Sequence, residues 1–354
     1  MLHFHSNDRP SALFNREGLN TYLSQTLTKP EAVSEQHYVA MTPVDKAQHD
    51  RARILHLSGG IVLNTPYLHE AKVLLQRCFA QNSGRNSGHT GLMLSGRSTV
   101  GKTTIAKSLM RYVYNHYARA YPNFSAHDQV PVVYVEVPAA STGKLLMTTF
   151  AEFFGMHIRS GESMGSIRSR IVDVIGAAGT QLIVVDELQN LAGRGTGNGE
   201  SVDLLKNLHN DLPATFVYAG IELTGGALLA GPRGQQLSSR FNILEMEPFH
   251  LSDAQHRSTW RKLLPAFEAE LPLRDHEAGT LASLSNYLYQ RTGGSIGSLG
   301  RLITDAAIEA INNPKLPEKV NEILLDTITI DHTAELSNLK SAARKGKTQG
   351  AKAA

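Results

Sequence analysis

The feature of this sequence that most limits its fold is a loop bounded by two glycines and followed by a lysine and two threonines. An apolar run at 91–95 precedes the loop, and a helical pattern over 103–118 follows it. In this context the spacing is that of a P-loop, whose backbone N–H groups cradle phosphates. We therefore predict that the phosphates of ATP are bound by Gly96, Arg97, Ser98, Thr99, Val100, Gly101, Lys102, Thr103 and Thr104.

An acidic pair, Asp186 and Glu187, follows a second apolar run at 181–185. Asp186 and the Thr103 hydroxyl are expected to hold Mg²⁺, while Lys102 reaches the β- and γ-phosphates. The Glu187 carboxylate is expected to orient or deprotonate the attacking water. The pair therefore favours an ATPase, which converts ATP and water to ADP and phosphate, over a protein that only binds nucleotide.

Short apolar runs alternate with helical patterns through the first two thirds of the chain. The runs lie at 91–95, 132–137, 181–186, 215–220 and 242–246, and the helical patterns between them at 103–118, 144–154, 166–178 and 202–211. This alternation predicts an α/β fold in which helices cover both faces of a parallel sheet of about five strands. Beyond residue 252 only helical patterns remain, at 256–267, 281–291 and 296–311, which predicts a small all-helical lid domain.

These patterns divide the chain into four parts. Residues 1–50 lack sustained periodicity and are expected to form an extended arm, and 51–250 form the nucleotide-binding domain with a helix before the P-loop, starting at Pro66. The lid takes 251–335, and 336–354 is expected to be a flexible tail. All charged side chains of that tail are positive, so it either contacts phosphates or a partner, or only aids solubility.

Overall composition excludes several classes of protein. The 35 lysines and arginines stand against 32 aspartates and glutamates, so net charge does not by itself indicate a nucleic-acid binder. No apolar run is long enough to span a membrane and no secretory signal pattern begins the chain, so we expect a cytoplasmic protein without a membrane partner. The single cysteine, Cys78, cannot form an internal disulfide, and we expect a buried thiol.

Four stretches, 94–104, 183–191, 216–220 and 236–241, resemble the AAA+ ATPases. The Asp-Glu-Leu-Gln-Asn-Leu run at 186–191, the helix before the P-loop and the short lid resemble in particular the TnsC/TniB-like regulators of bacterial DNA transposition. The resemblance covers residues from about 50 to 312. It implies a three-layer α/β/α AAA+ domain followed by a helical lid.

The family resemblance also implies that ATP lies between neighbouring subunits of a hexameric or heptameric ring or a helical filament. Arg240 is the first candidate for the arginine that completes a neighbour's site, and Arg233 the second. The sequence departs from the family where a polar phosphate sensor often follows the fourth strand, because Ile221 stands there. In the lid Gly297 replaces a sensing arginine, for which Arg301 is a substitute, and both departures favour slow hydrolysis.

The resemblance implies non-sequence-specific binding of double-stranded DNA. Ser141, Thr142 and Lys144 lie in the matching segment and are expected to contact phosphates, although Thr142 equally suits a helix cap. The expected partners are a transposase and a target-selection adaptor protein, linked in the ATP form and released on hydrolysis. A replication initiator or helicase loader, and a signalling or secretion ATPase that acts on proteins, remain alternatives.

Overall fold

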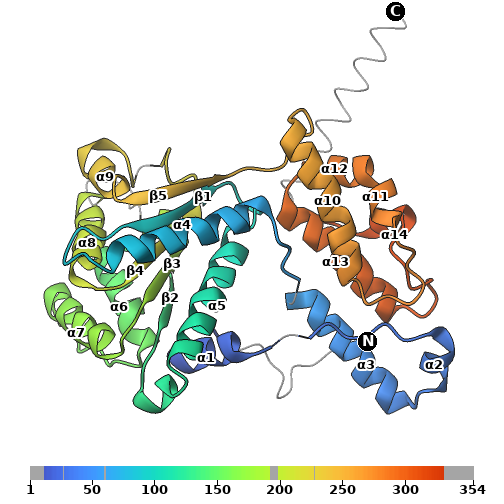
Figure 1. The fold of residues 1–354 in the computed structure, drawn as a ribbon, viewed down its shortest axis with the longest axis horizontal. Coiled ribbons are helices and arrows are strands. Elements are labelled where there is room, and N and C mark those ends of the chain that lie inside the picture. The colour runs from blue at the N-terminus through green and yellow to red at the C-terminus, as the bar shows by residue number, and fades with distance from the viewer. Residues whose placement is uncertain (1–11, 27, 60, 192–197, 227, 331–354) are drawn as a thin grey trace, which may run out of the picture. The chain divides into compact units, whose positions relative to one another are not determined.

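A computed structural model describes residues 12–26, 28–59, 61–191, 198–226 and 228–330, with backbone alone at 198–201 (Figure 1). The predicted tail at 336–354 lies outside the described residues. The described chain forms two compact units. The sheet unit contains 12–25 and 66–246, and the helical unit contains 26–65 and 247–330. Within the described residues the chain therefore passes between the units three times, after residues 25, 65 and 246.

The sheet unit is built on five parallel strands in the order β2-β3-β4-β1-β5. The strands are β1 (Gly91–Gly96), β2 (Val132–Glu136), β3 (Leu182–Asp186), β4 (Thr215–Ile221) and β5 (Phe241–Met246). Every residue of β1 and β3 is buried, as expected of strands covered on both faces. The predicted parallel α/β sheet is confirmed. Strand β4 is central, and β4 and β1 lie between β3, which ends at Asp186, and β5.

Helices connect these strands and form the outer layers (Figure 1). Helices α4 and α5 pack against each other in one group. In the other group α6 packs against α7 and α8, and α8 also packs against α9. Their bounds are α4 (Pro66–Asn82), α5 (Lys102–Ala120), α6 (Gly143–Phe153), α7 (Met164–Ala177), α8 (Asn198–Asp211) and α9 (Gly231–Ser238), with short 3₁₀ helices η1 (Phe124–His127) and η2 (Leu188–Leu191). The expected crossover helices are therefore present, and the unit has the three layers that the family resemblance implies.

The helical unit surrounds a separate apolar core that includes the fully buried Trp260. Its C-terminal helices are α10 (Ala254–Glu270), α11 (Thr280–Ser283), α12 (Ser285–Thr292), α13 (Ile296–Asn312) and α14 (Glu322–Thr327). The pattern at 281–291 predicted one helix, but the structure has two, because the chain leaves regular helical geometry at Leu284. The predicted all-helical C-terminal region is otherwise confirmed.

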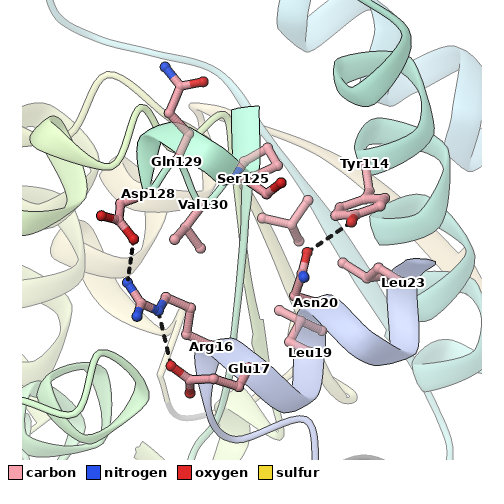
Figure 2. Close-up of a pocket in the computed structure, with 12 residues that line it drawn as sticks. Arg16, Glu17, Leu19, Asn20, Leu23, Tyr114, Ser125, Asp128, Gln129 and Val130 are labelled. Atoms are coloured by element: carbon pink, nitrogen blue, oxygen red, sulfur yellow. Dashed lines mark hydrogen bonds and ion pairs between the residues drawn. The ribbon is translucent and has the colours of Figure 1, made fainter. Parts of the chain in front are cut away.

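The N-terminal region differs from the predicted extended arm, because three helices lie among its described residues. The first, α1 (Arg16–Ser24), begins at Asn15, whose side chain accepts the Gly18 N–H at 2.7 Å. Leu19 and Leu23 on α1 are buried in the core of the sheet unit. Figure 2 shows α1 beside α5, where the Tyr114 hydroxyl donates to the Asn20 side chain at 2.8 Å. Leu19, Tyr22 and Leu23, at spacings of three and four residues, were the apolar signal for this short helix.

The other two, α2 (Glu35–Ala40) and α3 (Pro43–Gly59), belong to the helical unit. The side chain that α3 buries most completely is Arg53, which is 0% exposed. Arg53 pairs with Asp50 at 2.5 Å and with the buried Glu318, and it donates to the Pro272 carbonyl at 3.0 Å. A search for apolar periodicity counts an arginine as a surface residue, so it does not find this face of α3.

Two expectations from composition concern single elements. Cys78 is fully buried on α4, and burial raises the pKa of its thiol, although a hydrogen bond from Asn242 opposes this shift. This agrees with the prediction of a buried thiol. Among the described helices, none is long and apolar enough to cross a membrane.

Candidate nucleotide-binding site

The loop between β1 and α5 has the backbone geometry that its glycines predict. Gly96 has φ 153°, and a Cβ there would lie 2.2 Å from the carbonyl oxygen of Met246. Gly101 has φ 95° and caps α5, and Thr99 also has a positive φ, at 64°. The loop leads into the N-terminus of a 19-residue helix, where free N–H groups and the helix dipole favour an anion. The predicted phosphate-binding segment is therefore a tight turn at a helix N-terminus.

Lys102 lies in the interior of this turn and is 8% exposed. Its ammonium group donates to the carbonyl oxygens of Gly96 at 3.0 Å and Arg97 at 2.6 Å. Burial lowers the pKa of Lys102, and the negative charges of Glu187 and Asp186 oppose this shift. The Lys102 ammonium therefore lies close enough to both acidic side chains to interact with their charges.

Asp186, at the end of β3, is 2% exposed and accepts three hydrogen bonds. Its Oδ2 accepts from the Thr103 hydroxyl at 2.8 Å and from the Tyr134 hydroxyl at 3.3 Å. Its Oδ1 accepts the backbone N–H of Glu187 at 2.9 Å. The sequence reading missed Tyr134, which lies on β2. Its hydroxyl, a polar group within the apolar run at 132–137, was the available signal.

The surroundings of the Tyr134 hydroxyl favour its protonated form. Burial and then the charge of Asp186 raise the pKa of Tyr134 well above its usual range. The phenol therefore stays protonated and holds one carboxylate oxygen of Asp186 in place.

Thr103 and Asp186, which were predicted from distant parts of the sequence, are in direct contact. A threonine hydroxyl and an aspartate carboxylate are oxygen ligands, the type that Mg²⁺ prefers, and Mg²⁺ usually takes its other ligands from water and substrate phosphates. These two residues therefore fit a magnesium ion bound beside nucleotide phosphates.

Glu187 follows Asp186 with φ 56°, in the left-handed region that non-glycine residues seldom adopt. Its carboxylate accepts a hydrogen bond from the Gln189 side-chain amide. The carbonyl oxygen of the same Gln189 side chain accepts the backbone N–H of Ile221 at 2.8 Å. The sequence predicted no polar side chain at Ile221 after β4. The structure places the amide of Gln189 beside this strand end, which sequence reasoning did not find.

Arg240 lies at the opposite edge of the sheet from the P-loop. It precedes β5, and its carbonyl accepts the N–H of Gly91 at the start of β1, whereas the P-loop follows the end of β1. Its guanidinium donates to the Asn210 side chain at 2.5 Å. Arg233 is exposed on α9 and pairs with Asp203 at 3.2 Å. Neither arginine is part of the P-loop site of its own subunit.

The segment predicted to contact DNA follows β2. Thr142 is the N-cap of α6, because its hydroxyl accepts the Leu145 N–H at 3.2 Å, and both Thr142 and Lys144 are exposed. Ser141 is only 2% exposed, and its backbone N–H donates to the Asn190 carbonyl at 3.0 Å. The assignment of Ser141 as a DNA contact therefore needs correction, since the side chain is buried and its hydroxyl donates to the Thr142 carbonyl at 3.3 Å. In the helical unit Arg301 pairs with Asp305 at 3.4 Å.

The comparisons with known proteins agree with this geometry. Residues 66–251, more than half of the chain, match the family described as Bacterial TniB protein. The chain belongs to the bacterial TniB family. The resemblance to this family that the motifs indicated is therefore confirmed. A comparison with curated protein sequences gives no match.

Solved structures share the fold of this TniB-family chain. The Aeropyrum pernix ORC1 protein in complex with DNA has a TM-score of 0.55 and 18% identity, with 78% of this chain and 68% of that chain covered. The Aeropyrum pernix ORC2 protein in its ADP form has a TM-score of 0.55 and 18% identity, with coverages of 77% and 70%. At this identity the likeness establishes the AAA+ fold alone.

Proposed function

We propose that this chain is an ATP-dependent regulator of DNA transposition. It assembles on double-stranded DNA in its ATP form, links a target-selection adaptor to a transposase, and disassembles on hydrolysis. The observation that carries the proposal is the match of residues 66–251, which contain the P-loop and the acidic pair, to the TniB family. Support comes from the site itself, where a P-loop, a buried aspartate and an adjacent glutamate meet at one edge of the sheet.

The proposed reaction is hydrolysis of ATP to ADP and phosphate. The loop 96–104 and the N-terminus of α5 bind the phosphates, and Lys102 exchanges its two loop carbonyls for phosphate oxygens. Thr103 and Asp186 hold Mg²⁺, which neutralises charge that develops on the phosphates. Glu187 orients the attacking water and accepts its proton.

Arg240 is proposed to act on the nucleotide of a neighbouring subunit. Its position at the opposite edge of the sheet supports this role, because it precedes β5 while the P-loop follows β1. An arginine supplied in this way raises hydrolysis rates by about 10³ to 10⁵. Hydrolysis would therefore depend on assembly into a hexameric or heptameric ring or a filament.

Contacts with DNA are proposed for Thr142 and Lys144, which are exposed at the first turn of α6. One lysine per subunit gives weak binding, but repetition around an assembly gives several phosphate contacts and a steep salt dependence without base readout. The Thr142 cap and a DNA contact are compatible, because the cap uses the hydroxyl as an acceptor and leaves its proton free to donate.

Two variants test the nucleotide chemistry. Lys102→Ala should lose binding of a fluorescent ATP analogue. Glu187→Gln should bind that analogue with the affinity of the wild type and show no phosphate release. Wild-type phosphate release by Glu187→Gln would remove Glu187 from its proposed role.

Electron microscopy with duplex DNA tests the assembly. Rings or filaments are expected with a non-hydrolysable ATP analogue, and they should be absent with ADP. Arg240→Ala should bind nucleotide and hydrolyse it slowly, and Arg233→Ala should hydrolyse it faster than Arg240→Ala. Slow hydrolysis by Arg233→Ala alone would assign the role to Arg233, the second candidate. Protein that stays monomeric and ignores DNA with the analogue would contradict the proposal.

The second candidate function is a replication initiator or helicase loader. The observation that favours it is the fold shared with the ORC1 protein of a DNA complex, which at 18% identity concerns architecture only. A loader deposits a second ring on DNA, so cross-linking to a replicative helicase would support it, and dependence of transposition on the chain would favour the first candidate.

A further inference from the structure

We propose that Gln189 is a positioning residue that holds the Glu187 carboxylate in the orientation needed for hydrolysis, by clamping it to the end of β4. The inference rests on the proposed hydrolytic function and adds a residue to it.

The clamp consists of two hydrogen bonds from one side chain. The Gln189 amide nitrogen donates to the Glu187 carboxylate, and the Gln189 carbonyl oxygen accepts the Ile221 N–H at 2.8 Å. The task requires a donor at one atom and an acceptor at the other, which an amide supplies and a carboxylate or alkyl group does not. The bond to the carboxylate is charge-assisted, so it is the stronger of the two.

Gly220, the residue before Ile221, provides the space for this side chain. A Cβ at Gly220 would lie 2.6 Å from the Gln189 carbonyl oxygen and 2.7 Å from Cδ2 of Leu223. Gly220 is not among the glycines with positive φ, so residues other than glycine could adopt its backbone conformation. The contacts with Gln189 and with Leu223 therefore both explain the absence of a side chain at Gly220.

Neighbouring contacts fix the backbone around Glu187, so only the orientation of its side chain can still vary. Leu188 is fully buried, and Asn190 donates its N–H to the Glu187 carbonyl at 2.9 Å and its side-chain amide to Val137 at 2.9 Å. The clamp removes that freedom by attachment to β4. This strand pairs with β1, which carries the P-loop, and with β3, which carries Asp186. The carboxylate is thus fixed relative to both halves of the site.

A clamp of this kind acts on the chemical step. Loss of orientation of a catalytic group lowers kcat, and a misplacement of about 1 Å can cost about 100-fold. Binding of ATP uses the P-loop and Lys102, which Gln189 does not contact in the described structure. Gln189→Ala should therefore lower kcat by about 10- to 100-fold and leave KM and the affinity for a fluorescent ATP analogue unchanged.

A second variant separates loss of the hydrogen-bond donor from loss of packing. Gln189→Glu keeps the size of the side chain but places a carboxylate against that of Glu187. A carboxylate cannot donate a hydrogen bond to Glu187. Gln189→Glu should therefore lower kcat at least as much as Gln189→Ala and leave KM unchanged, although a purely space-filling role would be kept by a side chain of the same size.

Gly220→Ala tests the same contact from the other side. Its methyl group should displace Gln189 and lower kcat as Gln189→Ala does, and the double variant should be no slower than Gln189→Ala alone. Thermal melts followed by circular dichroism confirm that each variant is folded. A wild-type or raised kcat in Gln189→Ala, a wild-type kcat in Gln189→Glu, or additive losses in the double variant would each overturn the proposal.

Glu187→Gln separates failure of this inference from failure of the proposed function. If Glu187→Gln releases phosphate at the wild-type rate, the hydrolytic assignment itself is wrong. If Glu187→Gln is inactive while Gln189→Ala has wild-type kcat, only the clamp is wrong.

Discussion

Acidification should destabilise the sheet unit through one buried histidine. His209 on α8 is 0% exposed and packs against the rings of Phe216 and Phe241 at centroid distances of 5.2 and 4.9 Å. Its Nε2 contacts the His89 carbonyl, and its Nδ1 has no hydrogen-bond partner in the described structure. A proton added at Nδ1 would therefore be a buried charge without an acceptor.

The magnitude follows from the pKa. Burial lowers the pKa of His209 to about 4, the contact with the His89 carbonyl opposes this shift, and the positive charge of Arg240 adds to it. The unfolded chain, with a pKa of about 6.5, binds the proton first, so the free energy of unfolding falls as pH drops from 6.5 toward 4. The loss amounts to about 2 kcal/mol at pH 5 and about 3 kcal/mol below pH 4.

The assay is urea denaturation followed by circular dichroism at pH 7.5 and pH 5.0, on the wild type and on His209→Gln. The glutamine amide can still donate to the His89 carbonyl but does not titrate, so the variant should be less stable at pH 7.5. The difference between the two proteins should shrink by about 2 kcal/mol at pH 5.0, or about 4–8 °C in Tm for a unit of this size. An unchanged difference between the two pH values would refute the reasoning.

Three further changes have defined outcomes. Arg53→Met leaves Glu318 buried with one cation fewer and should lower the free energy of unfolding by about 3 kcal/mol, measured from the fluorescence of the single tryptophan; a loss below about 1 kcal/mol would contradict a buried pair. Tyr134→Phe removes one donor to Asp186 and should weaken Mg²⁺-dependent ATP binding by about tenfold, measured by titration at fixed nucleotide, and equal affinity would argue against it. Deletion of 1–59 should abolish a cooperative melt, and a wild-type melt would show that this region is dispensable.

The sheet and the P-loop could be predicted because their signals are local. Strands covered on both faces read as short apolar runs, and a phosphate-binding turn requires glycines at fixed spacing. The contact of Thr103 with Asp186 followed from the same logic, because the ends of parallel strands meet at one edge of the sheet.

The side-chain contacts around the acidic pair could not be predicted in this way. Tyr134 and Gln189 act through the direction in which they point, which depends on how β2 and β4 lie beside β3. The course of the N-terminal region was missed for a different reason, since α3 attaches to the helical unit through a buried arginine, and local sequence gives no sign of the glutamate that receives it.

The pairing of Arg53 with Glu318 joins residues 265 positions apart, which has a consequence for synthesis in the cell. A ribosome adds about 5–20 residues per second, so about 10–50 s separate the emergence of these two side chains. During that interval the face of α3 that carries Arg53 is exposed to water and to other chains. The sheet unit, whose last strand ends at Met246, has been synthesised completely before Glu318, the partner of Arg53 on α3, is added. The helical unit, although it includes residues near the start of the chain, is therefore the last part that can fold.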